Sequence, residues 1–227
     1  MAVLLYQKAL MIRRTATPAK LALKRGRPSS TEVALIEQAI LGTARGMFLV
    51  DGFDGVSMEK IAAATGITRT TLYARYATKA DLFRAVVRET LARWYAVSRV
   101  KSTHGVTDLR EVLHLRVADM ASLLVDPLFR GLHSLILLNR HRFPDLAPLM
   151  HELGYLNAVR LLAEDIRAAA HRDAIPVERP EAVAEHILTS VYGWFLQYDL
   201  VRKLSAKDIE THGKKIVDLI LFAREQW

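Results

Sequence analysis

The side chains best suited to chemistry lie close together, between residues 69 and 79. Arg69, Thr70, Tyr73 and Arg75 share one short segment, and Lys79 follows shortly after it. An arginine can donate two parallel hydrogen bonds to a guanine edge, and a threonine can contact a thymine methyl group. Tyrosine and lysine side chains hold phosphate oxygens and so set the register of a protein on a duplex. Together, these residue types indicate DNA as the ligand.

Two short helices are needed to present these side chains, and residues 58–76 have the pattern of such a pair. Ser57 and Thr68 are placed to cap the free amides at the two helix starts. The turn between the helices needs a positive φ angle, which glycine adopts without strain. We expect the core and turn of the motif to be formed by Ile61, Ala62, Gly66, Ile67 and Leu72. Such a pair is a helix-turn-helix, whose second helix enters the major groove.

The sequence around this motif resembles the DNA-binding signature of TetR-type transcriptional regulators, over about residues 30–90. The parts that carry the resemblance are Gly52-Phe53, Leu72-Tyr73 with Tyr76, and Lys79-x-Asp-Leu-Phe83. The resemblance implies a three-helix DNA-binding domain, joined by a fourth helix to a larger helical domain for ligand binding and dimerisation. It also implies groove-facing roles for Arg69, Thr70, Tyr73 and Arg75, with Lys79 on the DNA backbone.

A basic segment precedes the motif. Residues 1–30 contain seven lysines and arginines and no acidic residue, whereas the charges of residues 31–227 are nearly balanced. We expect residues 1–29 to be a flexible arm that binds a polyanion; the alternatives are a solubilising extension and binding to an anionic membrane surface. Arg25-Gly26-Arg27-Pro28 matches the core of minor-groove hooks, so Arg25 and Arg27 are predicted to enter a narrow A·T-rich minor groove.

Composition narrows the class of protein further. The 227 residues include no cysteine and are 51% hydrophobic, which excludes disulfides and thiolate sites but allows a packed core. No run of 18 apolar residues is present, so we expect no membrane-spanning helix and a soluble cytoplasmic protein. The eight histidines lack metal-ligand spacing, and no catalytic motif is found. We therefore expect no metal, no cofactor and no enzymatic activity.

Apolar periodicity predicts helices throughout, and no alternating strand pattern is present. After the motif, a capping box of Thr78 and Asp81 opens a connecting helix over 79–101. Longer helices are predicted at about 108–125, 127–141, 145–171, 179–203 and 206–226. The expected fold is all-α, with an arm at 1–29, the helix-turn-helix domain at 30–78, and an effector-binding and dimerisation domain at 79–227.

The larger helical domain offers weaker signals. The candidate residues for a ligand pocket lie on apolar helix faces, where ordinary core packing explains each of them as well: Trp94, Val117, Met120, His133, Leu137 and Trp194. Their character indicates an effector that is apolar or aromatic in part. The segments 145–171 and 179–203 are the expected dimer interface. Nearby, Arg142-Phe143-Pro144-Asp145-Leu146 resembles a stretch that precedes the dimer helices in some branches of the same family.

Two functions fit the sequence. The first is a sequence-specific DNA-binding transcriptional regulator: a dimeric repressor that a small-molecule effector releases from a pseudo-palindromic, double-stranded operator. The second is an architectural DNA-binding protein that uses the basic arm and needs no effector. Such a protein would show weak sequence preference and a steep dependence of affinity on salt.

Overall fold

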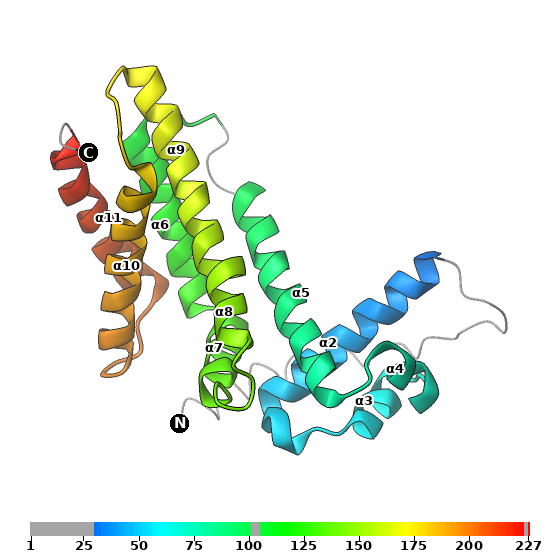
Figure 1. The fold of residues 1–227 in the computed structure, drawn as a ribbon. Helices are drawn as coiled ribbons and strands as arrows, with labels where there is room; N and C mark the ends of the chain where they lie inside the picture. Colours follow the sequence, from blue (N-terminus) through cyan, green and yellow to red (C-terminus); the bar gives the residue numbers. More distant parts are fainter. Residues whose placement is uncertain (1–29, 101–104, 225–226) are drawn as a thin grey trace. The chain divides into compact units, whose positions relative to one another are not determined.

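The computed structural model describes residues 30–100, 105–224 and 227. All regular secondary structure in these ranges is helical, which confirms the predicted all-α class (Figure 1). The predicted arm at 1–29, with Arg25 and Arg27, lies outside the described residues. The described chain divides into two compact units. One contains the residues up to Thr90 together with Gly131–Leu146, and the other contains Leu91–Arg130 and Ala147–Trp227.

The N-terminal unit contains the predicted three helices. These are α2 (Ser30–Gly55), α3 (Met58–Thr65) and α4 (Arg69–Arg75), followed by the first half of α5 (Lys79–Val100). The helix α2 is interrupted near its end, where Gly52 has a φ angle of +70° and leaves helical geometry. The capping box at the start of α5 is formed as predicted, because Thr78 and Asp81 each accept a hydrogen bond from the other's backbone amide.

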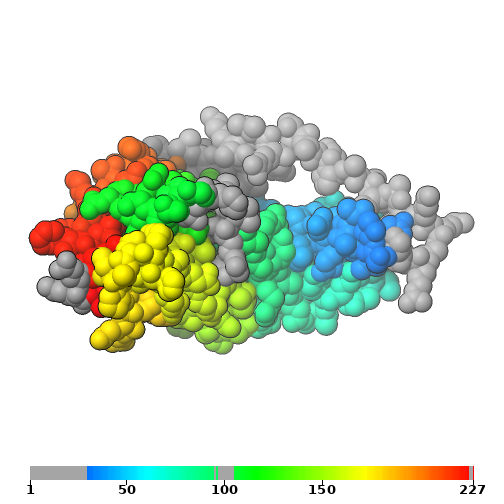
Figure 2. Space-filling view, turned by 90° about the horizontal axis from the view of Figure 1, so that it is seen from above, coloured from blue at the N-terminus to red at the C-terminus, as the bar shows by residue number. Residues whose placement is uncertain are grey.

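A column of apolar side chains on α2 forms much of the core of this unit. Ile36, Ile40, Ala44 and Phe48 follow one another at four-residue steps, and each is at most 2% exposed. Burying an isoleucine or phenylalanine side chain contributes about 1.5–3 kcal/mol to the free energy of unfolding. The first turns of α2, by contrast, are exposed along the surface (Figure 2, blue). The column therefore fixes which face of α2 meets α3.

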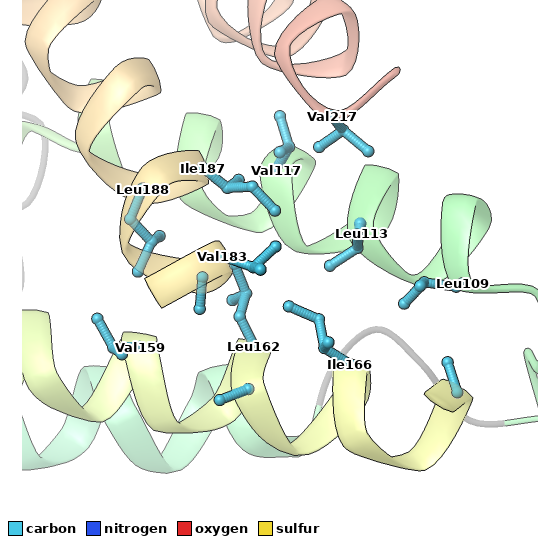
Figure 3. Close-up of a cluster of buried hydrophobic side chains, with 13 residues drawn as sticks. Leu109, Leu113, Val117, Val159, Leu162, Ile166, Val183, Ile187, Leu188 and Val217 are labelled. Carbon is cyan, nitrogen blue, oxygen red and sulfur yellow. The ribbon is translucent and has the colours of Figure 1, made fainter. Parts of the chain in front are cut away.

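The C-terminal unit is a bundle of four long helices. In it, α6 (Leu109–Val125) packs against α9 (Asn157–Asp173) and α11 (Ala206–Phe222), and α10 (Pro180–Asp199) packs against α9 and α11 (Figure 1). Leu113, Ile166 and Ile187 are fully buried where side chains of these helices point toward one another (Figure 3). Because the centre of the bundle is filled by aliphatic side chains, helix packing dominates the stability of this unit.

Two contacts set the spacing of these helices. At Gly213 of α11, an added Cβ atom would lie only 2.4 Å from Val117 Cγ1 on α6 and 3.2 Å from Val191 Cγ2 on α10. The absence of a side chain at Gly213 therefore allows the helices to approach closely. On the other side of α6, the buried Arg116 guanidinium pairs with Asp165 of α9, at an N–O distance of 2.8 Å. This ion pair compensates a charge that would otherwise be costly to bury.

The largest departure from the predicted helices lies between residues 146 and 173. One helix was expected over 145–171, but the chain forms α8 (Leu146–Met150), a π-helical segment η1 (His151–Leu156) and then α9. A π turn holds one additional residue, so it changes the hydrophobic period too little to be seen in the sequence. Upstream, α7 (Pro127–Leu138) ends before the predicted residue 141.

By length and composition alone, α2 could cross a membrane, since an 18-residue window in it has a mean hydropathy of 1.4. The same test is met by α6 and α7 taken together, although a 67° bend separates them. The sequence-based expectation of no such helix rested on a stricter criterion, an unbroken apolar run. In this fold, both stretches supply buried core residues, for example Ile40 of α2 and Leu113 of α6.

Candidate nucleic-acid interface

Local hydrogen bonds define the two helices of the motif. The hydroxyl oxygen of Ser57 accepts a hydrogen bond from the amide of Lys60 at the start of α3, and that of Thr68 accepts one from the amide of Thr71 at the start of α4. Between the helices, Gly66 has a φ angle of +73° and ends α3 in the left-handed conformation. The caps and the glycine therefore occupy the positions that the sequence predicted.

The apolar motif residues are buried together. Ile61 and Leu72 are fully buried, and Ala62 and Ile67 are at most 7% exposed. Thr65, at a position that is commonly apolar in such motifs, is also buried, and its hydroxyl donates to the carbonyl oxygen of Ile61 at 2.7 Å. This local hydrogen bond satisfies the polar group, so α4 is held on α3 without a buried unpaired hydroxyl.

Three of the predicted DNA-contacting residues lie on the exposed side of α4. Arg69 and Thr70 are exposed in its first turn, and Tyr73 is 43% exposed one turn later. The hydroxyl of Tyr73 donates to Glu59 Oε1 of α3 at 3.3 Å, which orients the phenol ring. The exposed side of α4 thus presents a guanidinium, a hydroxyl and an aromatic side chain, which are groups suited to base edges and phosphates.

Arg75 has a different environment, although it lies on the same helix. Its Nη1 atom pairs with Glu37 Oε2 of α2 at 3.0 Å, and its side chain is 23% exposed. Glu37 also accepts a hydrogen bond from the hydroxyl of Tyr76. Burial, together with the bond to Glu37, raises the pKa of Tyr76 well above its ordinary range. Arg75 and Tyr76 therefore attach the end of α4 to α2.

Lys79 is likewise engaged within the N-terminal unit. Its Nζ atom donates to the carbonyl oxygens of Phe53 and Val56, both at 2.7 Å, and lies 4.4 Å from the centre of the Phe53 ring. Phe53 follows the Gly52 break, and Val56 lies just after the end of α2. In the described protein, Lys79 thus stabilises the chain between α2 and α3. Its predicted contact with the DNA backbone stays a prediction.

The six candidate pocket residues have different surroundings. Val117 is 2% exposed and packed in the bundle core beside Gly213, and Met120 packs at the edge of the same core. Trp94 packs against Phe129, with ring centres 5.3 Å apart. Leu137 is 43% exposed, and burial lowers the pKa of His133.

Trp194 stacks on His212, with ring centres 4.2 Å apart, beside a surface groove of about 290 Å³ between α10 and α11. None of the other five candidates lines this groove. Within the described ranges, no group of three histidine, aspartate or glutamate side chains is arranged to hold a metal ion.

Together, the fold and the exposed side of α4 define a helix-turn-helix DNA-binding protein of the all-α class. The family described as bacterial regulatory proteins of the tetR family matches residues 40–86. Residues 40–86 of the N-terminal unit therefore match the DNA-binding domain of this family, in agreement with the resemblance that the motif indicated. The chain is also similar to the HTH-type transcriptional repressor AcnR of Corynebacterium diphtheriae, with 29% identity over 86 residues. That match covers 37% of this chain and 44% of the repressor.

Solved structures extend the likeness to the whole fold. A TetR-family transcriptional regulator from Mesorhizobium loti superposes with a TM-score of 0.77 at 22% identity, covering 86% of this chain and 98% of that one. A transcriptional regulator from Saccharomonospora viridis in complex with choline has a TM-score of 0.63 at 18% identity, covering 82% and 96%. At these identities, the likeness establishes the fold: an N-terminal helix-turn-helix followed by a larger helical domain.

The structure also identifies residues that the sequence did not single out for a role in the interface. Glu59 orients Tyr73, and Glu37 holds Arg75 and Tyr76. Phe143, far along the chain, completes the aromatic core of the N-terminal unit. Only Phe143 had a signal in the sequence, because it lies in the Arg-Phe-Pro-Asp stretch; an acidic residue on a helix surface carries no such pattern.

Proposed function

We propose that this chain is a sequence-specific DNA-binding transcriptional regulator of the cytoplasm. In this proposal it is a dimeric repressor that a small-molecule effector releases from a pseudo-palindromic operator. The observation that supports it most strongly is the exposed set of Arg69, Thr70 and Tyr73 on a short helix fixed by two caps and a buried core. Rigid presentation matters because base readout depends on hydrogen-bond geometry.

Within this proposal, the described side chains divide by role. Arg69 and Thr70 contact base edges, and Tyr73 binds a backbone phosphate. Arg75 and Lys79, which already have partners in the protein, act first by holding α4 and the α2–α3 connection in place. Arg25 and Arg27 add minor-groove contacts from the arm. A contact to a phosphate sets register, whereas a good bidentate contact to guanine contributes about 1–3 kcal/mol of discrimination.

Dimerisation is supported by exposed apolar side chains on the last two helices. Leu219 and Phe222 of α11 are 69% and 94% exposed, and Leu196 and Tyr198 of α10 are also exposed. The outer side of α9 instead carries charged residues such as Arg160, Glu164 and Arg167. These exposures support a proposed pairing surface on α10 and α11. The sequence also predicted that residues 145–171 contribute to the dimer interface. That contribution stays a prediction, and the charged outer side of α9 does not favour it.

Effector release follows from thermodynamic linkage. A ligand that fills the C-terminal unit weakens DNA binding only if it binds the DNA-free conformation more tightly than the DNA-bound one. The coupling between effector binding and operator binding is reciprocal. If the effector weakens operator binding by a given factor, the operator weakens effector binding by the same factor. The solved structure with choline gives one example of a chain of this fold that holds a small organic molecule.

The first experiment selects duplexes from a random pool with the purified full chain at near-physiological salt. The proposal predicts enrichment of a pseudo-palindrome, bound by two chains per duplex, because a two-fold protein reads a two-fold site. Recovery of unrelated sequences, with affinity that falls steeply with salt, would instead support the architectural function. The enriched duplex then serves as the probe in a screen for small molecules that release the protein.

A further inference from the structure

The surface groove between α10 and α11 lies wholly within the C-terminal unit, where the chain passes from one helix to the other. Its lining includes Trp194 of α10, Arg202 of the connection and Lys215 of α11. The two helices pack against each other (Figure 1). With a volume of about 290 Å³, the groove is at the lower end of the range of small-molecule sites, which begins at about 300 Å³.

Stacked aromatic rings form the apolar part of the lining. The ring centre of Trp194 lies 4.2 Å from that of His212, with 10° between the ring planes, and 5.0 Å from that of Tyr198. Trp194 and His212 are both partly buried. Because its neighbours hold the indole in place, a flat apolar group can pack against this stack without ordering flexible side chains.

The polar part of the lining is predominantly cationic. Arg202, Lys207 and Lys215 contribute three positive charges, against the single carboxylate of Asp208. That carboxylate already has partners, since it completes the capping box of α11 with Ser205 and accepts a hydrogen bond from Arg202 Nη2 at 3.4 Å. The groove therefore has an excess of positive charge.

The sequence shows the same concentration of charge. Residues 202–215 contain five lysines and arginines but only two acidic residues, although the charges of residues 31–227 as a whole are nearly balanced. A cationic cluster in a concave surface raises the local concentration of anions.

Several hydrogen-bond donors of the lining have no partner within the described residues. They are the indole N–H of Trp194, the hydroxyl of Thr211 and the ammonium group of Lys215. Lys207 is only loosely paired, because its Nζ atom lies 3.9 Å from Glu210 Oε2. Burial lowers the pKa of His212, and the nearby charge of Lys215 lowers that pKa further, so the positive potential reaches the ring stack. Unpartnered donors and positive potential are complementary to an anionic acceptor.

We propose that this groove binds a small organic anion with a flat apolar part, such as an aromatic carboxylate. The carboxylate accepts hydrogen bonds from Lys215 and Lys207, and the flat part packs against the ring stack of Trp194. None of the four exposed apolar residues assigned to the proposed pairing surface lines the groove. The inference does not rest on the proposed function, since the site is formed without α4 and without DNA.

The test titrates the isotope-labelled full chain with naphthoate and follows the indole N–H signals of its three tryptophans, Trp94, Trp194 and Trp227, by NMR. Trp194→Phe assigns the Trp194 signal. Two control ligands separate the parts of the proposed anion: naphthamide has the same rings without the charge, and acetate has the carboxylate without the rings.

Two lysine variants separate the groove from the general surface charge. Lys215→Gln removes the cation that has no partner in the described protein. Lys203→Gln, the matched control, removes an exposed lysine of the same basic stretch that does not line the groove. Both positions are exposed, and circular dichroism verifies that each variant is folded.

We expect naphthoate to shift the Trp194 signal until it saturates at one ligand per chain, while the signals of Trp94 and Trp227 stay in place. Affinity should fall several-fold in Lys215→Gln and equal that of wild type in Lys203→Gln. Naphthamide and acetate should bind wild type several-fold more weakly than naphthoate does.

Three results would overturn the inference. A Trp194 signal that does not move would show that the groove does not bind the anion. An equal loss of affinity in the two lysine variants would show attraction to the general surface charge alone. Equal affinity for naphthoate and naphthamide would show that the cations of the groove contribute nothing.

Discussion

Arg69 and Arg75 lie on the same short helix, yet their surroundings differ. Arg69 is exposed in the first turn of α4, whereas Arg75 pairs with Glu37 of α2. The sequence predicted that both face DNA, because residue type alone does not reveal a partner supplied by another helix. What could be predicted was the local chemistry around them: the caps at Ser57 and Thr68 and the glycine in the turn.

At Gly66, backbone conformation leads to a prediction about stability. The positive φ angle of Gly66 costs an alanine about 1–2 kcal/mol, so Gly66→Ala should lower the free energy of unfolding by that amount. Gly46→Ala is the matched control, since Gly46 is helical and an added Cβ meets nothing within 4 Å. That change should raise the free energy of unfolding by about 0.5–1 kcal/mol. Urea unfolding measures the free energy of unfolding of both variants. Equal changes in the two variants would contradict a special backbone requirement at Gly66.

His133 leads to a prediction about pH. Burial lowers its pKa below the ordinary 6.5, so the folded chain favours the neutral imidazole. The unfolded chain then binds more protons, and the stabilising contribution is complete above about pH 6.5 and lost as the pH falls below it. Between pH values of about 7.5 and 5.5, wild-type protein should lose more stability in urea than His133→Asn. His141→Asn, at an exposed histidine, should behave like wild type; a wild-type loss matched by His133→Asn would contradict the assignment.

At the scale of elements, helix starts were predicted more accurately than helix interiors. α6, α7, α10 and α11 begin within a residue or two of the predicted positions, since proline and capping residues mark their starts. The π-helical η1 was missed, because its stacked His151 and Tyr155 have no distinct spacing in the sequence. Val117 was considered for a ligand pocket, but the structure places it against Gly213, a contact between helices that periodicity cannot reveal.

That contact can be tested by a pair of substitutions. Gly213→Ala should lower the free energy of unfolding by about 1–3 kcal/mol, because the new methyl group has no room beside Val117. Adding Val117→Ala makes space for it, so the double variant should lose less than the two single changes combined. Chemical denaturation of the three variants and the wild type gives the coupling energy. Strictly additive losses would show that α6 and α11 do not meet there.

At the scale of the whole molecule, the motif predicted that a DNA-binding unit precedes a larger helical unit. It did not predict which residues belong to each unit. The sequence predicted a helix-turn-helix domain ending at residue 78, whereas the N-terminal unit also includes the first half of α5 and residues 131–146. Residues 131–146 belong to the N-terminal unit because Phe143 packs against Phe53 and Phe83. No local sequence pattern encodes a contact between residues so far apart in the chain. The candidate ligand-pocket residues stay a prediction, since aromatic residues serve both cores and ligand sites.

Assembly should depend on the exposed apolar surface of α11. Leu219→Asp combined with Phe222→Asp puts two charges at that surface, and we expect sedimentation to show monomers where the wild type forms dimers. Affinity for a palindromic duplex should fall with the dimer, whereas affinity for a single half-site should not. Leu138→Asp, at an 81% exposed leucine of α7, is the control. Dimers of the α11 variant as stable as those of wild type would place the interface elsewhere.

The central claim is that the exposed side of α4 reads DNA sequence. The most direct measurement is the ratio of affinities for the selected operator and a scrambled duplex, at one salt concentration, for wild type, Arg69→Ala and Arg110→Ala. Arg110 is an exposed arginine of α6, outside the motif. We predict that Arg69→Ala loses about 1–3 kcal/mol of discrimination while Arg110→Ala keeps the wild-type ratio. An unchanged ratio for Arg69→Ala would contradict the claim.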